Sequence, residues 1–286
     1  MINRKSMLEI IHDANGTMTS YKNEAADFAR DSFTIALDKD NDYLYIGFNK
    51  PFYNLYVELE TANTNANSFT AEYYDDEGSW SSLTLLDETK GFTRSGFIQW
   101  RKNLGLKYED SSNNIEEWDE TTVNGVEAYY IRLRPSATHS STAVRGIGLV
   151  FSDDQDLAAE FYGISDYLSS RDSFILVHAS ARDKLIQDLT DKGAFNTGYD
   201  GQELLTPFDI FRIEELRLAS TYLALSLIFE NASDDPDGNL ANKAITYRER
   251  YQRIISKAQV THDIDDDGIM EDGEKTSKLQ TRIMTR

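Results

Sequence analysis

The chain has 286 residues, 40% of them hydrophobic, and no cysteine, a composition typical of a globular protein with one to three domains and a sizeable core. The 49 acidic side chains outnumber the 29 basic ones and give a net charge of −20, which disfavours nonspecific binding to nucleic acid and to anionic lipid. The lack of cysteine excludes thiolate catalysis, zinc–thiolate sites, iron–sulfur clusters and disulfides. No apolar run reaches the roughly 18 residues of a membrane span, and no apolar segment follows the N-terminal residues 1–5, so we expect no membrane partner and synthesis in the cytoplasm.

Residues 32–152 predict an antiparallel β-sandwich, preceded by an N-terminal arm over residues 1–31. The predicted sandwich is rich in Tyr, Phe, Trp, Thr and Val in short runs that Asn, Asp, Gly and Ser separate. Asn124-Gly125 and the stretch Asp75–Gly78 carry turn residues that tolerate positive φ and indicate hairpins. The predicted strands are Phe33–Leu37, Tyr43–Phe48, Asn54–Leu59, Phe69–Tyr74, Gly96–Trp100, Ala128–Arg134 and Ile147–Phe151.

The strand Ala128–Arg134 shows the alternation most clearly. Tyr129, Ile131 and Leu133 fall on one face, and Tyr130, Arg132 and Arg134 fall on the other. We therefore expect the first face to be core and the second to be wet.

Residues 153–260 show helical periods and predict a separate helical domain. The stretch Ser180–Asp183 resembles a capping box and predicts the start of an amphipathic helix that Gly193 closes. The preceding Phe174–His178 fits either a strand or an earlier turn of the same helix.

Two further helices are predicted in this domain. The clearest begins at Thr206-Pro207, an N-cap followed by proline at the first helical position, and runs to about Glu230. Its apolar stripe is broad and implies burial on more than one side, against neighbouring helices or another subunit. A two-faced helix from about Leu240 to Val260 completes a small bundle.

Residues 261–286 combine an acidic loop with a basic tail. Lys and Arg gather in the last helix and in this tail, so a locally basic region lies on an acidic chain and predicts contact with an acidic protein surface, including another copy of the chain. The candidate interface residues are Phe208, Phe211, Tyr222, Arg248, Arg250, Arg253, Arg282 and Arg286.

The acidic loop matches the twelve-residue calcium loop of EF-hand proteins. Its carboxylates occupy positions 1, 3, 5 and 12, and Gly268 stands at the turn position 6. Close carboxylates repel one another unless a cation offsets their charge, so the pattern favours a structural calcium ion; an acidic loop that stays solvated is the alternative. The candidate metal ligands are Asp263, Asp265, Asp267, Ile269 through its carbonyl, Glu271 and Glu274.

No catalytic motif stands out, so we expect a protein that is not an enzyme. The histidines, His12, His139, His178 and His262, share no metal-binding spacing, and we expect each to be solvated or packed. Nucleophile motifs and Gly-rich phosphate loops are absent from the sequence, and no carboxylate pair of a glycosidase stands out. Trp80, Trp100 and Trp118 either fill a sandwich core, form a platform for sugars or anchor an interface.

Several stretches resemble proteins of tailed bacteriophages. Tyr43–Phe52, Gly91–Trp100 and Tyr130–Arg134 resemble β-sandwich modules of virion proteins. Ala181–Gln187 and Leu205–Arg217, followed by the helix around Tyr247 and the Asp-rich loop, are similar to helical head–tail connector (adaptor or neck) proteins.

This resemblance implies an α+β fold, in which a jelly-roll-like antiparallel β-sandwich precedes an α-helical bundle with an EF-hand-like loop. It further implies a virion protein that is made in the bacterial cytoplasm, forms a homo-oligomeric ring, docks on the portal protein, contacts neck or tail proteins and lets DNA pass without specific binding. Similar sandwiches occur in baseplates and fibres, so a tail or baseplate module that binds carbohydrate or a receptor is the alternative. A glycoside-cleaving enzyme is a third hypothesis.

Overall fold

The computed structural model describes residues 8–25, 28–29, 31–100, 118–168, 172–192, 205–210, 212–235, 238–260, 262 and 277–278. These residues divide into a β-rich unit up to Leu149 and a helical unit from Val150 onward. The division lies a few residues before the predicted boundary after Ser152.

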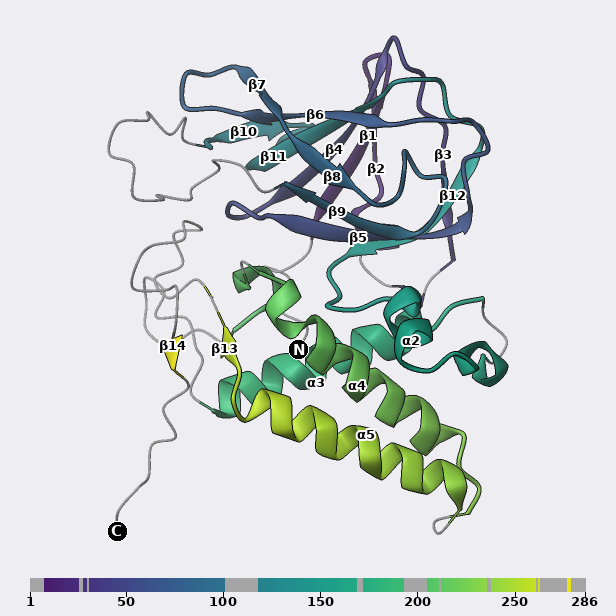
Figure 1. Cartoon of the computed structure of the whole chain (residues 1–286). Helices are drawn as coiled ribbons and strands as arrows, with labels where there is room; N and C mark the ends of the chain where they lie inside the picture. The colour runs from purple at the N-terminus through teal and green to yellow at the C-terminus, as the bar shows by residue number, and fades with distance from the viewer. Residues whose placement is uncertain are drawn as a thin grey trace. The chain divides into compact units, whose positions relative to one another are not determined.

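The β-rich unit contains two antiparallel sheets, which Figure 1 shows as two layers. The larger sheet consists of Glu9–Ala14 (β1), Thr17–Ser20 (β2), Asp42–Phe48 (β4), Phe69–Tyr74 (β6), Trp80–Leu83 (β7), Glu120–Val123 (β10) and Val126–Pro135 (β11). The smaller sheet consists of Phe33–Ile35 (β3), Asn54–Thr61 (β5), Leu85–Asp87 (β8), Gly96–Trp100 (β9) and Thr142–Gly148 (β12). The strand orders are β2-β1-β4-β11-β6-β7, with β10 paired to β11, and β3-β12-β5-β9-β8. With the helices that follow, these sheets confirm an α+β chain with a β-rich N-terminal part.

The first two strands lie in the region that the sequence analysis interpreted as an N-terminal arm. They pair as a hairpin, and β1 also pairs with β4, from Glu9 opposite Gly47 to Ala14 opposite Asp42. The hairpin turns at Asn15 and Gly16, whose φ angles are 51° and 87°. Residues 9–20 thus belong to the larger sheet, and a short helix, Lys22–Ala25 (α1), follows them.

Both predicted hairpins are confirmed. Asn124 and Gly125 join β10 to β11 with φ angles of 51° and 77°, as a two-residue hairpin of this type requires. Gly78, with a φ of 80°, lies in the turn between β6 and β7.

The prediction of a wet face for β11 is only partly correct. Ile131 and Leu133 are fully buried and Arg132 is half-buried, as the alternation predicts. Tyr130, however, is also fully buried, although it shares the face of Arg132. Its ring lies over Gly47, where a Cβ would overlap it, and a second apolar cluster covers this part of the sheet. The members of that cluster are Ile11, Tyr45, Val123, Ala128 and Tyr130, with Tyr43 and Trp80 packed against them.

The helical unit begins with Asp154–Glu160 (α2), Ile164–Tyr167 (η2) and Ile175–Asp191 (α3). Asp153 caps α2, because its carboxylate accepts the N–H groups of Gln155 and Asp156. Phe174 is the N-cap of α3 and Ile175–His178 belong to its first turn, so the stretch Phe174–His178 is an early turn of that helix and not a strand. The predicted cap at Ser180 is wrong, because Ser180 lies inside α3 and its hydroxyl donates to the carbonyl of Leu176 (2.8 Å).

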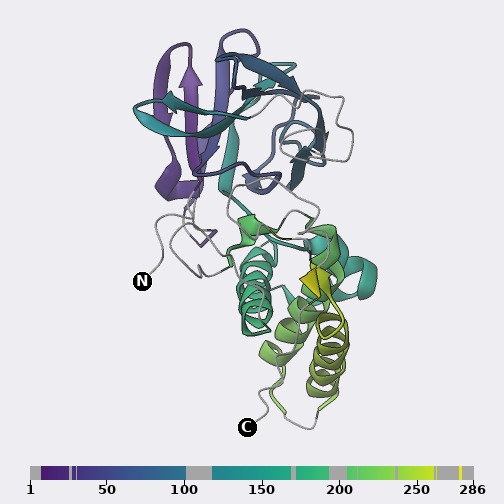
Figure 2. The ribbon, with the colours of Figure 1, turned by 90° about the vertical axis from the view of Figure 1, so that its left-hand side faces the viewer.

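The remaining elements are Pro207–Asp209 (η3), Glu214–Asn231 (α4), Asn239–Ile255 (α5) and the short strands Gln259–Val260 (β13) and Ser277–Lys278 (β14). The helix predicted from Thr206 is split: a 3-10 turn, in which the N–H of Thr206 donates to the carboxylate of Asp209, precedes α4. Helices α3 and α5 both pack against α4 (Figure 2), which explains the broad apolar stripe of α4. Within the described residues, no helix has both the length and the hydrophobicity that crossing a membrane requires.

Candidate functional site

The structure describes five of the eight predicted interface residues. Tyr222 lies on α4, Arg248, Arg250 and Arg253 lie on α5, and Phe208 lies in η3. Outside the described residues are Phe211, Arg282 and Arg286, together with the six predicted metal ligands Asp263, Asp265, Asp267, Ile269, Glu271 and Glu274. Among the residues that are described, no group of three histidine or carboxylate side chains is placed to hold a metal ion.

Arg250 joins α5 to α4 through aromatic rings. Its guanidinium carbon lies 5.1 Å from the ring centre of Tyr247 and 5.6 Å from that of Tyr222. The two rings are 5.9 Å apart. Burial raises the pKa of Tyr247, and the nearby Arg250 cation partly offsets this rise. The exposed Arg250 thus presents its charge over a tyrosine pair.

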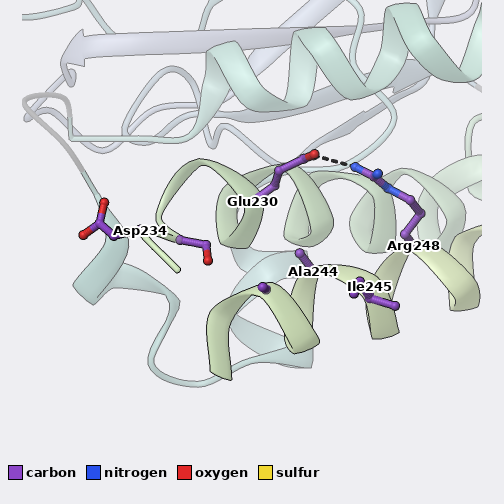
Figure 3. A pocket seen from close by; sticks show the side chains of 7 residues that line it. Glu230, Asp234, Ala244, Ile245 and Arg248 are labelled. Carbon is purple, nitrogen blue, oxygen red and sulfur yellow. Dashed lines mark hydrogen bonds and ion pairs between the residues drawn. The ribbon is translucent and has the colours of Figure 1, made fainter. Parts of the chain in front are cut away.

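Arg248 lies at a groove between the end of α4 and the start of α5 (Figure 3). Its guanidinium pairs with the carboxylate of Glu230 at 2.5 Å, and both side chains are about half exposed. The exposed Ile245 gives this groove an apolar wall. Its volume is about 280 Å³, and it is lined by Glu230, Ser233, Asp234, Ala241, Ala244, Ile245 and Arg248.

A larger groove of about 780 Å³ lies among α3, α4 and α5. The hydroxyl of Tyr251 donates to the carboxylate of Asp188 at 2.6 Å, and the ammonium of Lys184 pairs with the same carboxylate at 2.7 Å. Burial lowers the pKa of Lys192, and the nearby Asp188 carboxylate offsets part of this fall. The groove is lined by Ser180, Lys184, Asp188, Asp191, Lys192, Leu223, Leu227, Arg248, Tyr251, Gln252, Ile255 and Ser256.

The charge of α5 is opposite to that of the whole chain. This helix carries four cations and one carboxylate, a net charge of +3, whereas the chain has a net charge of −20. Arg248, Arg250, Glu249 and Arg253 are all exposed. The structure therefore brings Tyr222 and the three predicted arginines of α5 together on one helix pair, while Phe208 lines neither groove.

A triad-like arrangement lies inside the helical unit. Ser152 Oγ is 2.9 Å from His178 Nδ1, and His178 Nε2 is 3.1 Å from Asp154 Oδ1. The residue types are those of a Ser–His–Asp triad, but the two ring nitrogens are exchanged, because in a triad the serine bonds to Nε2 and the aspartate to Nδ1. Ser152 is moreover fully buried, and its hydroxyl also bonds to that of Ser220 at 2.8 Å. We interpret this network as a polar connection between α2, α3 and α4.

An aromatic surface on the larger sheet was missed by the sequence analysis. The guanidinium carbon of Arg132 lies 4.3 Å from the ring centre of Trp80 and 4.5 Å from that of Tyr43, and Arg132 pairs with Glu72 at 2.7 Å. These four side chains, all half-buried, form the stacked-arginine surface. Alternation along β4, β6, β7 and β11 contains the signal, but the pairing of these strands has to be known before the four residues can be grouped.

The other two tryptophans belong to the core. Trp100 is 1% exposed and its indole N–H donates to the carbonyl of Phe52, whereas Trp118 is 7% exposed and its indole donates to the carbonyl of Tyr130. Only Trp80 among the three is available at a surface.

The four histidines are all packed. His12 lies 3.3 Å from Asp42, His178 belongs to the Ser152 network, and His262 is buried. His139 is 5% exposed and packs against the rings of Phe69 and Phe92, and within the described structure its ring nitrogens have no hydrogen-bond partner.

Comparisons with known proteins give few matches. No protein-family model and no curated protein matches the chain. Two solved structures of a Family 89 glycoside hydrolase from Clostridium perfringens, one in complex with 2-acetamido-1,2-dideoxynojirmycin and one with PUGNAc, are each similar at 12% identity and a TM-score of 0.26. Each match covers 66% of this chain and 20% of the hydrolase chain. The chain thus spans about one fifth of the length of these proteins, and a likeness at this TM-score does not bear on its function.

Proposed function

We propose that the chain is a structural, non-enzymatic virion protein of a tailed phage: a ring-forming head–tail connector that docks on the portal and links it to the tail. In this proposal the two antiparallel sheets form a jelly-roll-like β-sandwich, and the helical unit makes the subunit and portal contacts. The protein is made in the host bacterial cytoplasm. The observation that carries the proposal is the net charge of +3 on α5, a helix that lines two grooves, in a chain whose net charge is −20.

Charge complementarity supports this assignment. A chain with a net charge of −20 repels other copies unless a cationic surface faces an acidic one, and α5 provides such a cationic surface. The same overall charge suits a channel wall, because an acidic wall does not bind the DNA that passes through it. Interfaces of this kind gain specificity and association rate from their charges and weaken as salt rises.

Co-sedimentation of the full chain with purified portal rings tests the proposal. We expect the wild-type chain to bind, and Arg248→Glu combined with Arg253→Glu to weaken binding about tenfold or more, because α5, through which the ring assembles and docks, loses two cations and gains two anions. Glu249→Lys, a charge change of opposite sign on the same helix, is the matched control and should retain binding. Unchanged binding by the double variant, or no binding by the wild type, would contradict the proposal.

A carbohydrate- or receptor-binding tail module is the second candidate, because the stacked-arginine surface leaves the half-buried Trp80 beside polar side chains. Flat rings next to planar hydrogen-bonding groups suit a sugar. Glycan-array binding that is lost on Trp80→Ala, and kept in the control Leu86→Ala on the smaller sheet, would favour this function.

The acidic loop between Asp263 and Glu274 carries a separate proposal, a structural calcium ion. The support is the spacing of its carboxylates. A chelator should lower the melting temperature of the wild type, and Asp263→Ala combined with Glu274→Ala should abolish that sensitivity. A melting curve that added calcium leaves unchanged would count against the ion.

A further inference from the structure

Tyr162, in the loop between α2 and η2, is 98% exposed. Its chain neighbours are fixed, because the ring of Phe161 packs 5.1 Å from that of Phe229 and Ile164 is 4% exposed. The anchored backbone on both sides of Tyr162 therefore directs its side chain away from the helical unit. Exposed tyrosines held on a rigid backbone are typical anchors of protein interfaces.

The segment that presents Tyr162 carries a negative charge, although Asp153, Asp154 and Asp156 bond to groups within the helical unit. Residues 150–168 contain five carboxylates and neither lysine nor arginine. Glu160 and Asp166 flank Tyr162 on its two sides in the chain. A surface that accepts Tyr162 therefore has to combine an apolar pocket with cations at its rim.

The larger groove has this chemistry. Its apolar floor is formed by Leu223, Leu227 and Ile255, and its volume of about 780 Å³ is several times that of a tyrosine side chain. Its lining includes three cations and two carboxylates, and the exposed Arg253 follows the lining residue Gln252. The three cations are Lys192, Lys184, which pairs with Asp188, and Arg248, which pairs with Glu230.

Tyr162 and the groove lie on different sides of α4. Leu223 and Leu227 are one helical turn apart and face the groove. Phe229, which anchors the Tyr162 segment through Phe161, is two residues further on and so points about 200° away around the helix. A tyrosine and a groove on different sides of one chain make a head-to-tail contact between copies, and such a contact builds a ring when the rotation from copy to copy closes.

We propose that Tyr162 of one copy inserts into the larger groove of the next copy, with its acidic segment against the cationic rim. The inference rests on the proposed ring-forming function and names the contact that builds the ring. Each copy uses one tyrosine and one groove, so every subunit of the ring is equivalent.

Analytical ultracentrifugation and negative-stain imaging of the full chain, alone and with portal rings, test the contact. Tyr162→Ala removes the anchor, and Gln252→Trp fills the groove from its exposed rim. Leu218→Ala, which trims another exposed apolar side chain, and Thr246→Trp, on α5 outside both groove linings, are the matched controls. We expect each test variant to raise the Kd of self-association about tenfold or more, and each control to assemble like the wild type.

Mixing the two test variants gives the sharpest result. Tyr162→Ala keeps its groove and Gln252→Trp keeps its tyrosine, so the mixture should form heterodimers and no larger assembly. Rings of wild-type size from either variant or from the mixture would overturn the inference and leave the connector proposal standing. If a test variant lost portal binding while its self-association stayed unchanged, the inference would also be overturned, because the portal and not another copy would then occupy the groove. A wild-type chain that stays monomeric with and without portal rings would overturn both proposals.

Discussion

Acid should destabilise the β-rich unit through His139. The imidazole is 5% exposed, and burial lowers its pKa from the ordinary 6.5 to about 4. At a pH between these two pKa values, the imidazole of His139 is protonated in the unfolded chain but not in the folded chain. The free energy of unfolding therefore falls as the pH falls. Since one pKa unit corresponds to 1.36 kcal/mol, the two pKa values give a fall of about 2 kcal/mol in the free energy of unfolding between pH 7 and pH 5.

Urea denaturation of the wild type and of His139→Leu at pH 7 and pH 5 measures this loss. Tryptophan fluorescence reports on the β-rich unit, because Trp80, Trp100 and Trp118 all lie in it. We expect His139→Leu to remove about 2 kcal/mol of the acid sensitivity at a similar stability at pH 7, since leucine fills the site against Phe69 and Phe92 without a polar atom. Equal pH dependence in both proteins would refute the assignment of the acid sensitivity to His139.

Three further changes test the packing of the two units. Ser152→Ala should lower the free energy of unfolding in urea by about 1–3 kcal/mol, because the buried partners of the hydroxyl lose a hydrogen bond. A fluorophosphonate probe should leave the native chain unlabelled, and labelling at Ser152 would show an accessible nucleophile. Gly125→Ala should lower the free energy of unfolding by about 1–2 kcal/mol, because alanine is strained at the φ of 77° and no described atom lies within 4 Å of the added Cβ. An unchanged urea midpoint would contradict this backbone strain. Leu216→Ala should cost about 2–5 kcal/mol by circular dichroism because Leu216 is fully buried in α4, and a loss under 1 kcal/mol would mean that the bundle is loosely packed.

The strands that were predicted correctly combine a clear alternation with a high content of aromatic and β-branched residues. Strands β6 and β9 begin and end where the sequence predicts, because aromatic and β-branched residues fill them and turn residues bound them. The β1–β2 hairpin was missed although Asn15-Gly16 is a strong hairpin signal, since β2 is exposed along its whole length and has no apolar alternation. The last predicted strand, Ile147–Phe151, was placed too late, because an apolar run alone does not reveal where pairing ends.

The predicted helix starts failed where a cap was inferred from residue type alone. Ser180 has the residue type of an N-cap but bonds back to the preceding turn of α3, a competition that only the complete helix reveals. The interface residues of α5 were predictable because charge and helical period are both properties of the sequence. The two grooves and the exposed Tyr162 were not, because they depend on how α2, α3 and α5 pack on α4.

Electron microscopy of the purified full chain mixed with portal rings shows whether the protein works by assembling through its helical surface. We expect closed rings of this chain stacked coaxially on the portal. Free monomers beside bare portal rings, at protein concentrations at which both remain folded, would contradict it.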